Sequence, residues 1–514
     1  MLPLQKDIPQ FDLDAYHPTP VIYQLRASIL HKLRHEEDPL PDIQGREETK
    51  KDVLRALLSG HNLYLISEEG TGKTRLAKSI AKLLPPIPVI KGCFYNDDPK
   101  WPKHLLCPRC QASKDPVKEF GIEFKSGDQR FSRIQGNDYT DESKLLGLKD
   151  IHAIVGGKSP VDPSVFAATG VFRANRGLLF LDELPSIRSK IQVLLHPITE
   201  EKLVILEEYG LEHPLDLILI ATGNPQSFAH LNEVPRPLLD RLEMIYMPLP
   251  DKDVEREIML QEKFVIDNGF YSPTWGESDV PAPVTKAEIK RDSILPWWNL
   301  YVLNAAIDHS RCCSLLDRKP SIRASARGLD HSYASAELNK HKMVLLSDVC
   351  EGLKLALRGR IELRPDKGDP ENAAENFRIT DEVSEDLLWN AVENLKNQFL
   401  EGIDEGMIAE EIASFPANGN RNISGWLQKC PELKRAVDHM KNLSSEKVNS
   451  DLLNDEERQL LKNPDTLSDD IISQYDYSAV EVIYNAALHK KLIAPEIISD
   501  KIFIPKMVPW AKEE

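Results

Sequence analysis

Residues 67–74 read SEEGTGKT, and their types and spacing suit a loop that binds phosphate groups. In such a loop, successive backbone N–H groups surround the phosphates at the N-terminus of a helix, where the helix dipole also favours negative charge. A lysine bridges phosphate oxygens, and a serine or threonine hydroxyl binds Mg²⁺. We therefore predict an ATP site in which Thr74 binds Mg²⁺. The predicted nucleotide contacts are Glu69, Gly70, Thr71, Gly72, Lys73, Thr74 and Arg75.

Ser67 stands where this motif ordinarily begins with glycine. The position lies where a strand turns into the loop, farther from the reacting phosphate than Lys73. If it requires a positive φ, a serine would cost around 1 kcal/mol, a tolerable strain. The alternative interpretation of the motif is a chance strand–turn–helix, so the residues downstream must decide.

A second group of residues that could take part in catalysis or bind a metal ion is LLFLDE, residues 178–183. An apolar strand that ends in two acids places carboxylates at the carboxyl edge of a parallel sheet, where ligands bind in open α/β folds. We predict that Asp182 holds Mg²⁺ and that Glu183 orients the attacking water. An apolar strand followed by an acid is a weak signal alone, but downstream of a phosphate loop it is a strong one.

A third candidate is Asn224 in LILIATGNP, residues 217–225. An amide at the end of a strand can hydrogen-bond both water and the γ-phosphate without adding charge. Taken alone, the same residues indicate an Asn-Pro turn after a buried strand.

These side chains must be positioned by alternating strands and helices, which implies a mostly parallel sheet. Apolar spacing predicts helices and strands around every motif. The helices are expected at 22–35, 43–60 (with Gly60 as its C-cap), 74–84 and 187–200, and the strands at 63–66, 178–181, 203–208 (turning at Gly210) and 215–221. Residues 91–140 are expected to form an irregular insert.

Bulk composition is that of a soluble globular protein, with 41% hydrophobic and 28% charged residues among 514. No apolar run approaches the ~18 residues of a membrane helix, and the first residues do not suit a signal peptide. We therefore expect a cytoplasmic protein. The net charge of −17 and the absence of a basic patch argue against nucleic-acid binding.

The seven cysteines do not suit a disulfide framework. Cys93, Cys107 and Cys110 all lie in the expected insert, and the last two form a C-x₂-C pair. Thiolates with this spacing could hold Zn²⁺ or an iron–sulfur cluster, with His104 or Asp97 as a fourth ligand. Three reduced, unliganded cysteines are the alternative. The pair Cys312-Cys313 is expected to fill a helical core.

The order GTGKT, ANRGLLFLDE, ATGNP and RPLLDRLE resembles that of an AAA+ ATPase. Within that superfamily the chain is most similar to the magnesium chelatase I-subunit and MoxR-type branch. The segments that carry this narrower resemblance are FAATGVFRANRGLLFLDELPSI (166–187), a hairpin-like KLVILEEYGLEHPLDLILIATGNP (202–225) and SIRASARGL (321–329). The resemblance covers about residues 43–364.

The resemblance implies an α/β P-loop NTPase domain with a parallel sheet, an α-helical lid and, beyond the match, a C-terminal helical extension. It implies that Arg241 is an arginine finger for a neighbouring subunit's γ-phosphate and that Arg323 is a second sensor. A surface salt bridge is the alternative for each arginine. From the resemblance together with the composition along the chain, we expect an arm (1–40), the ATPase core (41–265, with the insert 91–140), a linker (266–296), the lid (297–365) and an acidic C-terminal domain (366–514).

In that C-terminal domain, residues 380–412 hold ten acids and one lysine. An apolar stripe of Leu388, Val392, Leu395 and Phe399 nevertheless predicts a helix there. We expect a small helical domain with a solvated acidic face, in preference to a dedicated docking surface.

Three functions fit these residues. The first is a homo-oligomeric, hexamer-like AAA+ ring that hydrolyses ATP to remodel a protein partner, such as a protein with a von Willebrand A domain. The second is a nucleic-acid motor or transcription activator, and the third is a nucleotide-gated scaffold. The acidic charge weighs against the second, and Glu183 weighs against the third. No residue here suits porphyrin recognition, which favours partner remodelling over magnesium insertion.

Overall fold

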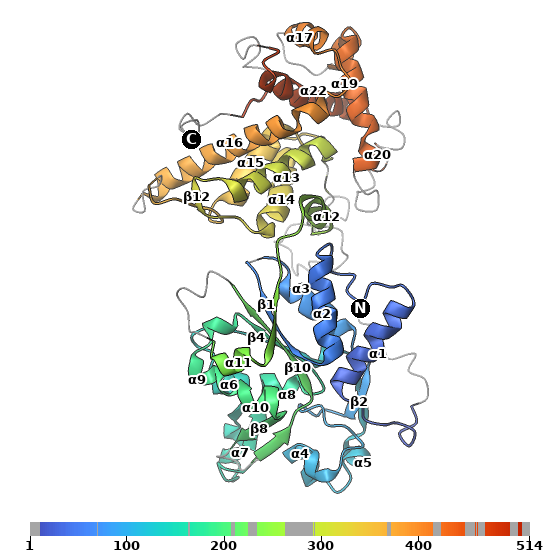
Figure 1. Cartoon of the computed structure of the whole chain (residues 1–514), viewed down its shortest axis with the longest axis vertical. Coiled ribbons are helices and arrows are strands. Elements are labelled where there is room, and N and C mark those ends of the chain that lie inside the picture. The colour runs from blue at the N-terminus through green and yellow to red at the C-terminus, as the bar shows by residue number, and fades with distance from the viewer. Residues whose placement is uncertain are drawn as a thin grey trace, which may run out of the picture. The chain divides into compact units, whose positions relative to one another are not determined.

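The computed structural model contains two compact units, Met1–Leu249 (unit 1) and Pro250–Glu514 (unit 2). Figure 1 shows the elements of both units. The described residues are 11–68, 70–162, 165–206, 211–224, 234–262, 291, 293–366, 372–414, 423–447, 458, 460, 468–493 and 502–505.

Unit 1 is built around a five-stranded parallel sheet in the order β11-β1-β10-β7-β4. Counted along the chain, these are the fifth, first, fourth, third and second strands. Figure 1 labels three of these strands, β1, β4 and β10. Because every neighbouring pair is parallel, all five carboxyl ends lie at one edge of the sheet. The strands are β1 (Asn62–Ile66), β4 (Phe131–Gln135), β7 (Gly177–Asp182), β10 (Leu217–Gly223) and β11 (Leu242–Tyr246).

The three inner strands are buried on both faces, which explains their nearly continuous apolar sequences. Successive side chains of β7 point to opposite faces, as a strand requires. Leu178 and Phe180 pack in one core with helices α1 (Val21–Arg34), α2 (Glu47–Ser59) and α3 (Lys73–Lys82). Leu179 and Leu181 pack in a second core on the other face. The sheet therefore lies between two apolar layers, as expected for an α/β domain.

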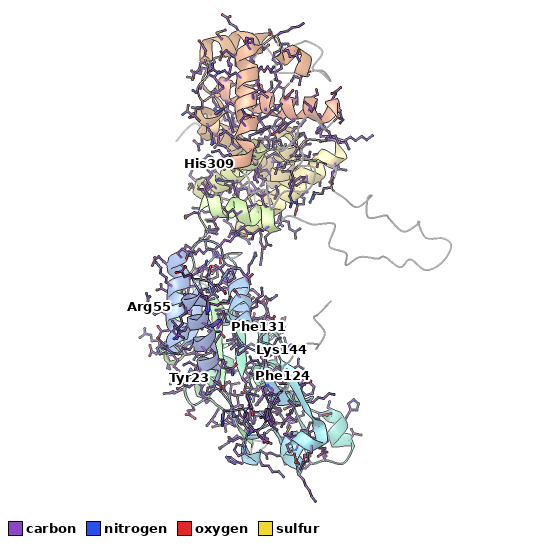
Figure 2. The ribbon with its side chains drawn as sticks, turned by 90° about the vertical axis from the view of Figure 1, so that its right-hand side faces the viewer. Tyr23, Arg55, Phe124, Phe131, Lys144 and His309 are labelled. Atoms are coloured by element: carbon purple, nitrogen blue, oxygen red, sulfur yellow. The ribbon has the colours of Figure 1, made fainter. Side chains whose placement is uncertain are left out.

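The segment 91–140, expected to be irregular, contains a strand of the central sheet. Phe131–Gln135 forms β4 and pairs in parallel with β7. Phe131, labelled in Figure 2, stacks on Phe180 with ring centroids 5.9 Å apart. The expectation was wrong here because FSRIQ is a short edge strand with only two apolar residues, a weak signal in sequence.

Smaller elements complete unit 1. They are β2 (Ile87–Ile90), α4 (Pro108–Ala112), α5 (Pro116–Phe120), β3 (Ile122–Lys125), α6 (Glu142–Leu145), β5 (Gly147–Lys149), α7 (Ile151–Val155), β6 (Phe166–Ala168), α8 (Gly170–Arg173), α9 (Ser189–Gln192), α10 (Leu195–Glu200), β8 (Leu203–Leu206), β9 (Leu211–Pro214) and α11 (Arg236–Leu239). The helix expected at 187–200 is thus two short helices. β8 and β9 form the expected hairpin, while its turn at Gly210 lies outside the described residues.

Unit 2 is a helical body around one continuous hydrophobic core. Its elements are α12 (Lys252–Glu262), α13 (Trp297–Cys312), β12 (Leu316–Arg318), α14 (Ile322–Leu338), α15 (Leu346–Leu357), β13 (Glu362–Leu363), α16 (Ala373–Phe399), α17 (Glu405–Ala413), α18 (Ile423–Leu427), α19 (Pro431–Asn442), α20 (Ser444–Lys447) and α22 (Asp469–His489). The apolar stripe expected in the acidic segment lies on α16 and contributes to this core.

Two boundaries differ from the expected ones. The regions expected as a lid and a separate C-terminal domain share the single core of unit 2. Helix α12, expected in the ATPase core, also belongs to unit 2, where its buried Glu255 pairs with Arg311 of α13 at 2.6 Å. Most of the expected linker lies outside the described residues. Cys312 is exposed and so does not fill a core. Among the described helices, none is both long and apolar enough to cross a membrane.

Candidate nucleotide-binding site

The predicted phosphate loop lies between β1 and α3. Gly70 and Gly72 have φ angles of +72° and +94°, which L side chains rarely adopt, so both positions favour glycine. Gly72 is the N-cap of α3, and the helix begins at Lys73. Thr74 and Arg75 lie in its first turn. The loop thus presents a helix N-terminus with its unsatisfied N–H groups, as phosphate binding requires.

Ser67 is buried and does not have a positive φ, so the strain considered from the sequence does not arise. Its hydroxyl lies 2.5 Å from the hydroxyl of Thr71, and this buried hydrogen bond links the two residues within the loop. The ammonium of Lys73 donates to the carbonyls of Ser67 and Glu68, at 2.7 and 3.1 Å. Lys73 therefore lies over the loop that would hold the phosphates. Glu69 lies outside the described residues.

The acidic pair lies at the end of β7, where Thr222 of β10 contacts both residues. The Thr222 hydroxyl donates to Asp182 Oδ1 at 2.9 Å and accepts from the backbone N–H of Glu183, also at 2.9 Å. Glu183 has a φ of +58°, uncommon for a residue other than glycine. Strained backbone of this kind often occurs at functional sites. The turn exposes the Glu183 carboxylate, while Asp182 stays mostly buried.

Two residues of β4 pair with these carboxylates. Arg133 Nη2 lies 2.6 Å from Asp182 Oδ2, and Gln135 Nε2 donates to Glu183 Oε2 at 3.1 Å. A Cβ at Gly136 would lie 2.2 Å from the Glu183 carbonyl, so the close approach of β4 to this turn requires glycine. Sequence reasoning missed Arg133, Gln135 and Thr222. Arg133 and Gln135 alternate along a strand that the sequence signalled weakly.

The strand order places the predicted groups at one edge of the sheet. The phosphate loop follows β1, Asn224 follows β10, and the acidic pair ends β7, so the amide lies between the loop and the carboxylates. The N–H of Ser67 donates to the Gly223 carbonyl at 3.2 Å, which joins the loop directly to the β10 end.

Arg241 lies at the opposite side of the sheet, where the amino ends of the strands meet. It directly precedes Leu242, which pairs with Asn62 at the start of β1, whereas the phosphate loop follows Ile66 at the end of that strand. Five strand residues span roughly 17 Å. Within its own chain, Arg241 forms an ion pair with Glu200 and donates to the Pro237 carbonyl. The sheet therefore separates Arg241 from the phosphate loop of the same chain.

Arg323 belongs to unit 2. It is exposed in the first turn of α14, whose N-cap Ser321 accepts its backbone N–H at 3.3 Å. Its role as a second sensor remains a prediction from the resemblance.

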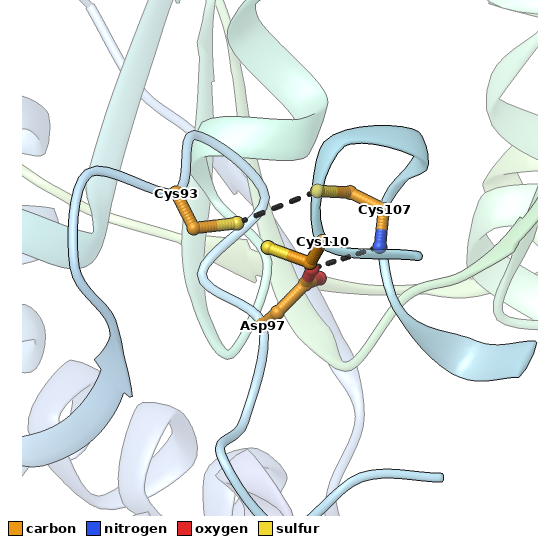
Figure 3. A group of neighbouring side chains, drawn as sticks. All are labelled: Cys93, Asp97, Cys107 and Cys110. Atoms are coloured by element: carbon orange, nitrogen blue, oxygen red, sulfur yellow. Dashed lines mark hydrogen bonds between the residues drawn. The ribbon is translucent and has the colours of Figure 1, made fainter. Parts of the chain in front are cut away.

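The structure also brings the three insert cysteines together. Cys93, Cys107 and Cys110 are buried side by side with Asp97, one of the two fourth ligands considered from the sequence (Figure 3). His104, the other candidate, is exposed and does not belong to this group.

Two segments of the chain match a known protein family. They contain every candidate nucleotide-site residue of unit 1 except Arg133 and Gln135. Residues 39–91 and 149–247 match the family model for magnesium chelatase, subunit ChlI. The unmatched residues between them hold the cysteine group and β4.

Relatives of known name agree with this match. Over 255 residues, the chain is 27% identical to the magnesium-chelatase 38 kDa subunit of Cereibacter sphaeroides, an alignment of 47% of this chain and 69% of the relative. It is 29% identical to the magnesium-chelatase subunit ChlI of a Nostoc species, over 40% of this chain and 53% of the relative. It is 25% identical to a ChlI homolog of Methanocaldococcus jannaschii, over 64% of this chain and 86% of the relative.

Among solved structures, a complex of the magnesium chelatase subunits BchI and BchD, based on cryo-EM, contains a similar chain. It is 18% identical, with a TM-score of 0.34, over 64% of this chain and 97% of that one.

Proposed function

We propose that the chain, which is similar to subunit ChlI of magnesium chelatase, is an AAA+ ATPase that hydrolyses ATP as a homo-oligomeric ring and uses the energy to remodel a protein partner. The observation that carries the proposal is the meeting of the phosphate loop, Asn224 and the acidic pair at one sheet edge, with Arg241 at the other edge.

The residues present suit ATP and Mg²⁺. Thr74 and Asp182 would hold Mg²⁺, which when bound neutralises charge on the phosphates. Asp182 already faces a cation, the Arg133 guanidinium at 2.6 Å, so its carboxylate suits positive charge. The helix N-terminus at Gly72 and the ammonium of Lys73 would hold the phosphate oxygens.

Glu183 would hold and polarise the attacking water. Its carboxylate is exposed, and Thr222 and Gln135 fix its backbone and side chain. The Asn224 amide, at the neighbouring strand end, would hydrogen-bond the same water and the γ-phosphate. A guanidinium from the Arg241 position of a second subunit would stabilise charge that develops on the phosphate, worth 10³–10⁵ in rate in GTPase precedents.

The proposal of a protein partner rests on the relatives, which are named as subunits of a larger enzyme. We propose a partner with a von Willebrand A domain, as the family resemblance implies. The acidic composition supports a protein client over nucleic acid.

The test compares the wild-type chain with two site variants. Lys73→Ala should lose nucleotide binding, whereas Glu183→Gln should bind ATP and hydrolyse it at least ~100-fold more slowly, because water activation is lost. The matched control is Glu142→Gln, an exposed glutamate on α6, which should behave like wild type. Wild-type turnover in Glu183→Gln would contradict the assignment of the base.

The effect of added partners on ATPase activity then distinguishes partner remodelling from a nucleic-acid motor and from a nucleotide-gated scaffold. We expect a von Willebrand A-domain protein captured by the stalled Glu183→Gln chain, and absent from a Lys73→Ala control, to stimulate wild-type ATPase activity. Stimulation by DNA instead would indicate a nucleic-acid motor. Binding of ATP with no turnover under any condition would indicate a nucleotide-gated scaffold.

A further inference from the structure

Four side chains outside the nucleotide site converge in the interior of unit 1. The Sγ atoms of Cys93, Cys107 and Cys110 and a carboxylate oxygen of Asp97 all lie within 4.8 Å of one another. All four residues are at most 2% exposed. Figure 3 shows the side chains pointing toward a common centre, two from the loop after β2 and two from the start of α4.

The spacing fits a single metal ion. Two ligands at ~2.3 Å from one ion in a tetrahedral arrangement are about 3.8 Å apart. The sulfurs of Cys93 and Cys107 are 3.7 Å apart, close to the tetrahedral value and far longer than the ~2.0 Å of a disulfide. The whole group is too tight to enclose several metal atoms.

Asp97 provides independent evidence that the group binds a cation. Its Oδ2 accepts the backbone N–H of Cys107 at 2.8 Å, but its Oδ1 is buried without a hydrogen-bond partner among the described residues. A buried carboxylate oxygen left unpaired is costly unless a positive charge compensates it. Three cysteines that merely filled a core would not need an acid among them.

The backbone holds the ligands at the spacing that chelation needs. Cys107 is the N-cap of α4, Pro108 occupies the first helical position, and Cys110 follows in the first turn, so both sulfurs lie on one face. Cys93 follows β2, where Gly92 has a φ of +69° that turns the chain back toward α4. This C-x₂-C turn is the usual way in which a short segment offers two thiolates to one metal.

We infer that Cys93, Asp97, Cys107 and Cys110 bind one Zn²⁺ ion. Soft thiolate ligands in a tetrahedral set select zinc, and four protein ligands leave no open position, as in structural zinc sites. The ATPase proposal plays no part in this inference, and the segments matched by the chelatase family model leave out all four ligands.

The zinc ion would stabilise a loop that is tied to the central sheet. Between the ligands, Asp98 forms a buried ion pair with Arg176 at 2.5 Å, and Asn96 donates to the Asn175 carbonyl at 2.9 Å. Arg176 directly precedes β7, the strand that carries the acidic pair. Loss of zinc should therefore loosen the insert first and the start of β7 with it.

Elemental analysis of the full chain, purified reduced and without chelators, tests the site. We expect about one zinc and no iron per chain. Cys107→Ser should lose most of this zinc, and Asp97→Asn should weaken zinc binding by at least about tenfold, since it keeps an oxygen but removes the charge of a ligand. Cys350→Ser, which removes a buried thiol of unit 2, is the matched control and should keep all the zinc. Lys73→Ala should also keep it, which separates this result from any failure of the ATPase proposal.

A second measurement avoids variants that fail to fold. When a thiol-specific mercurial is titrated into the wild-type chain, zinc released to a chromogenic chelator should follow the loss of three thiols. Replacement of zinc by Co²⁺ should give the thiolate-to-cobalt absorption of a tetrahedral site. Zinc far below one per chain, zinc unchanged in Cys107→Ser, iron in its place or a disulfide between Cys93 and Cys107 in the reduced protein would each overturn the inference.

Discussion

At the scale of single residues, Thr222 shows how a small side chain can organise the acidic pair. Its hydroxyl contacts Asp182 and the backbone of Glu183, and so ties the Asp182 carboxylate to the turn that carries Glu183. The positive φ of Glu183 then directs the second carboxylate toward solvent while the first stays buried. This division suits the proposed roles, because a metal ligand needs fixed geometry and a base needs access to water.

Arg133 should compete with Mg²⁺ for Asp182. The pair is 2.6 Å apart, and an ion pair that is partly exposed is worth up to ~1 kcal/mol. We expect Arg133→Gln to lower the Mg²⁺ concentration for half-maximal ATPase activity by about two- to fivefold. A Mg²⁺ titration at saturating ATP measures this, with Arg55→Gln on the exposed face of α2 as the control. An unchanged or higher Mg²⁺ requirement would show that Arg133 does not hold the carboxylate in competition with the metal.

The sequence predicted most residues of the candidate nucleotide site but not the side chains that contact them. Lys73, Asp182 and Asn224 follow apolar strands, so their place at a sheet edge was predictable. Thr222 and Gln135 could not be chosen without the strand order, because their contacts cross to a neighbouring strand. Ser67 departs from the glycine that usually begins the motif, and its hydroxyl contact with Thr71 shows that it fits the loop.

At the scale of elements, the inner strands were predictable, and the two edge strands, β4 and β11, were not expected. Strands β1, β7 and β10 are buried on both faces and therefore read as continuous apolar runs. Strand β4 is an edge strand with a mixed sequence, so nothing local distinguished it from the insert. The domain boundaries near α12 and between the lid and the C-terminal region also differ from the expected ones. Both depend on the packing of α12 and α16 into one core, and contacts between distant segments cannot be seen in local sequence.

Helix α22 carries a buried acid that should make the stability of unit 2 depend on pH. Burial raises the pKa of Glu481 to about 8, although Oε2 accepts the backbone N–H of Leu346 at 2.8 Å. Between its ordinary pKa and this value, the folded state binds more protons than the unfolded state, so stability falls as pH rises. In wild type the free energy of unfolding should decrease by up to a few kcal/mol over this pH range, and Glu481→Gln should remove that decrease.

Urea unfolding at about pH 5.5 and about pH 8.5 measures the difference, with the fluorescence of Trp297 and Trp298 reporting on the same core. Glu401→Gln, an exposed acid of unit 2, is the control and should keep the wild-type slope. An equal pH dependence in wild type and Glu481→Gln would mean that Glu481 is charged in the folded state.

At the scale of the whole molecule, the position of Arg241 predicts that activity requires assembly. If the guanidinium acts on a neighbour's nucleotide, activity per chain should rise steeply with protein concentration. Arg241→Ala should bind ATP but fail to hydrolyse it. Mixed with inactive Lys73→Ala, it should partly recover, because the Lys73→Ala neighbour still donates Arg241 to an intact pocket.

The control for this mixture is Glu200→Gln, which removes the acid that Arg241 contacts within its own chain. It should keep its activity, because the arginine remains available. Activity that does not depend on concentration, together with no recovery in the mixture, would mean that the site works within one chain.

The placement of Arg241 and the phosphate loop at opposite edges of one sheet has a consequence for symmetry. If the arginine and the pocket lie on two different surfaces of the subunit, their contact is heterologous, whereas a two-fold dimer needs both groups in the one patch that the partners share. Such heterologous contacts continue from subunit to subunit until the rotation closes, and they form an open filament if it does not. In a closed assembly each interface would complete one catalytic site, whereas a broken assembly would leave one unused arginine at one end and one incomplete pocket at the other.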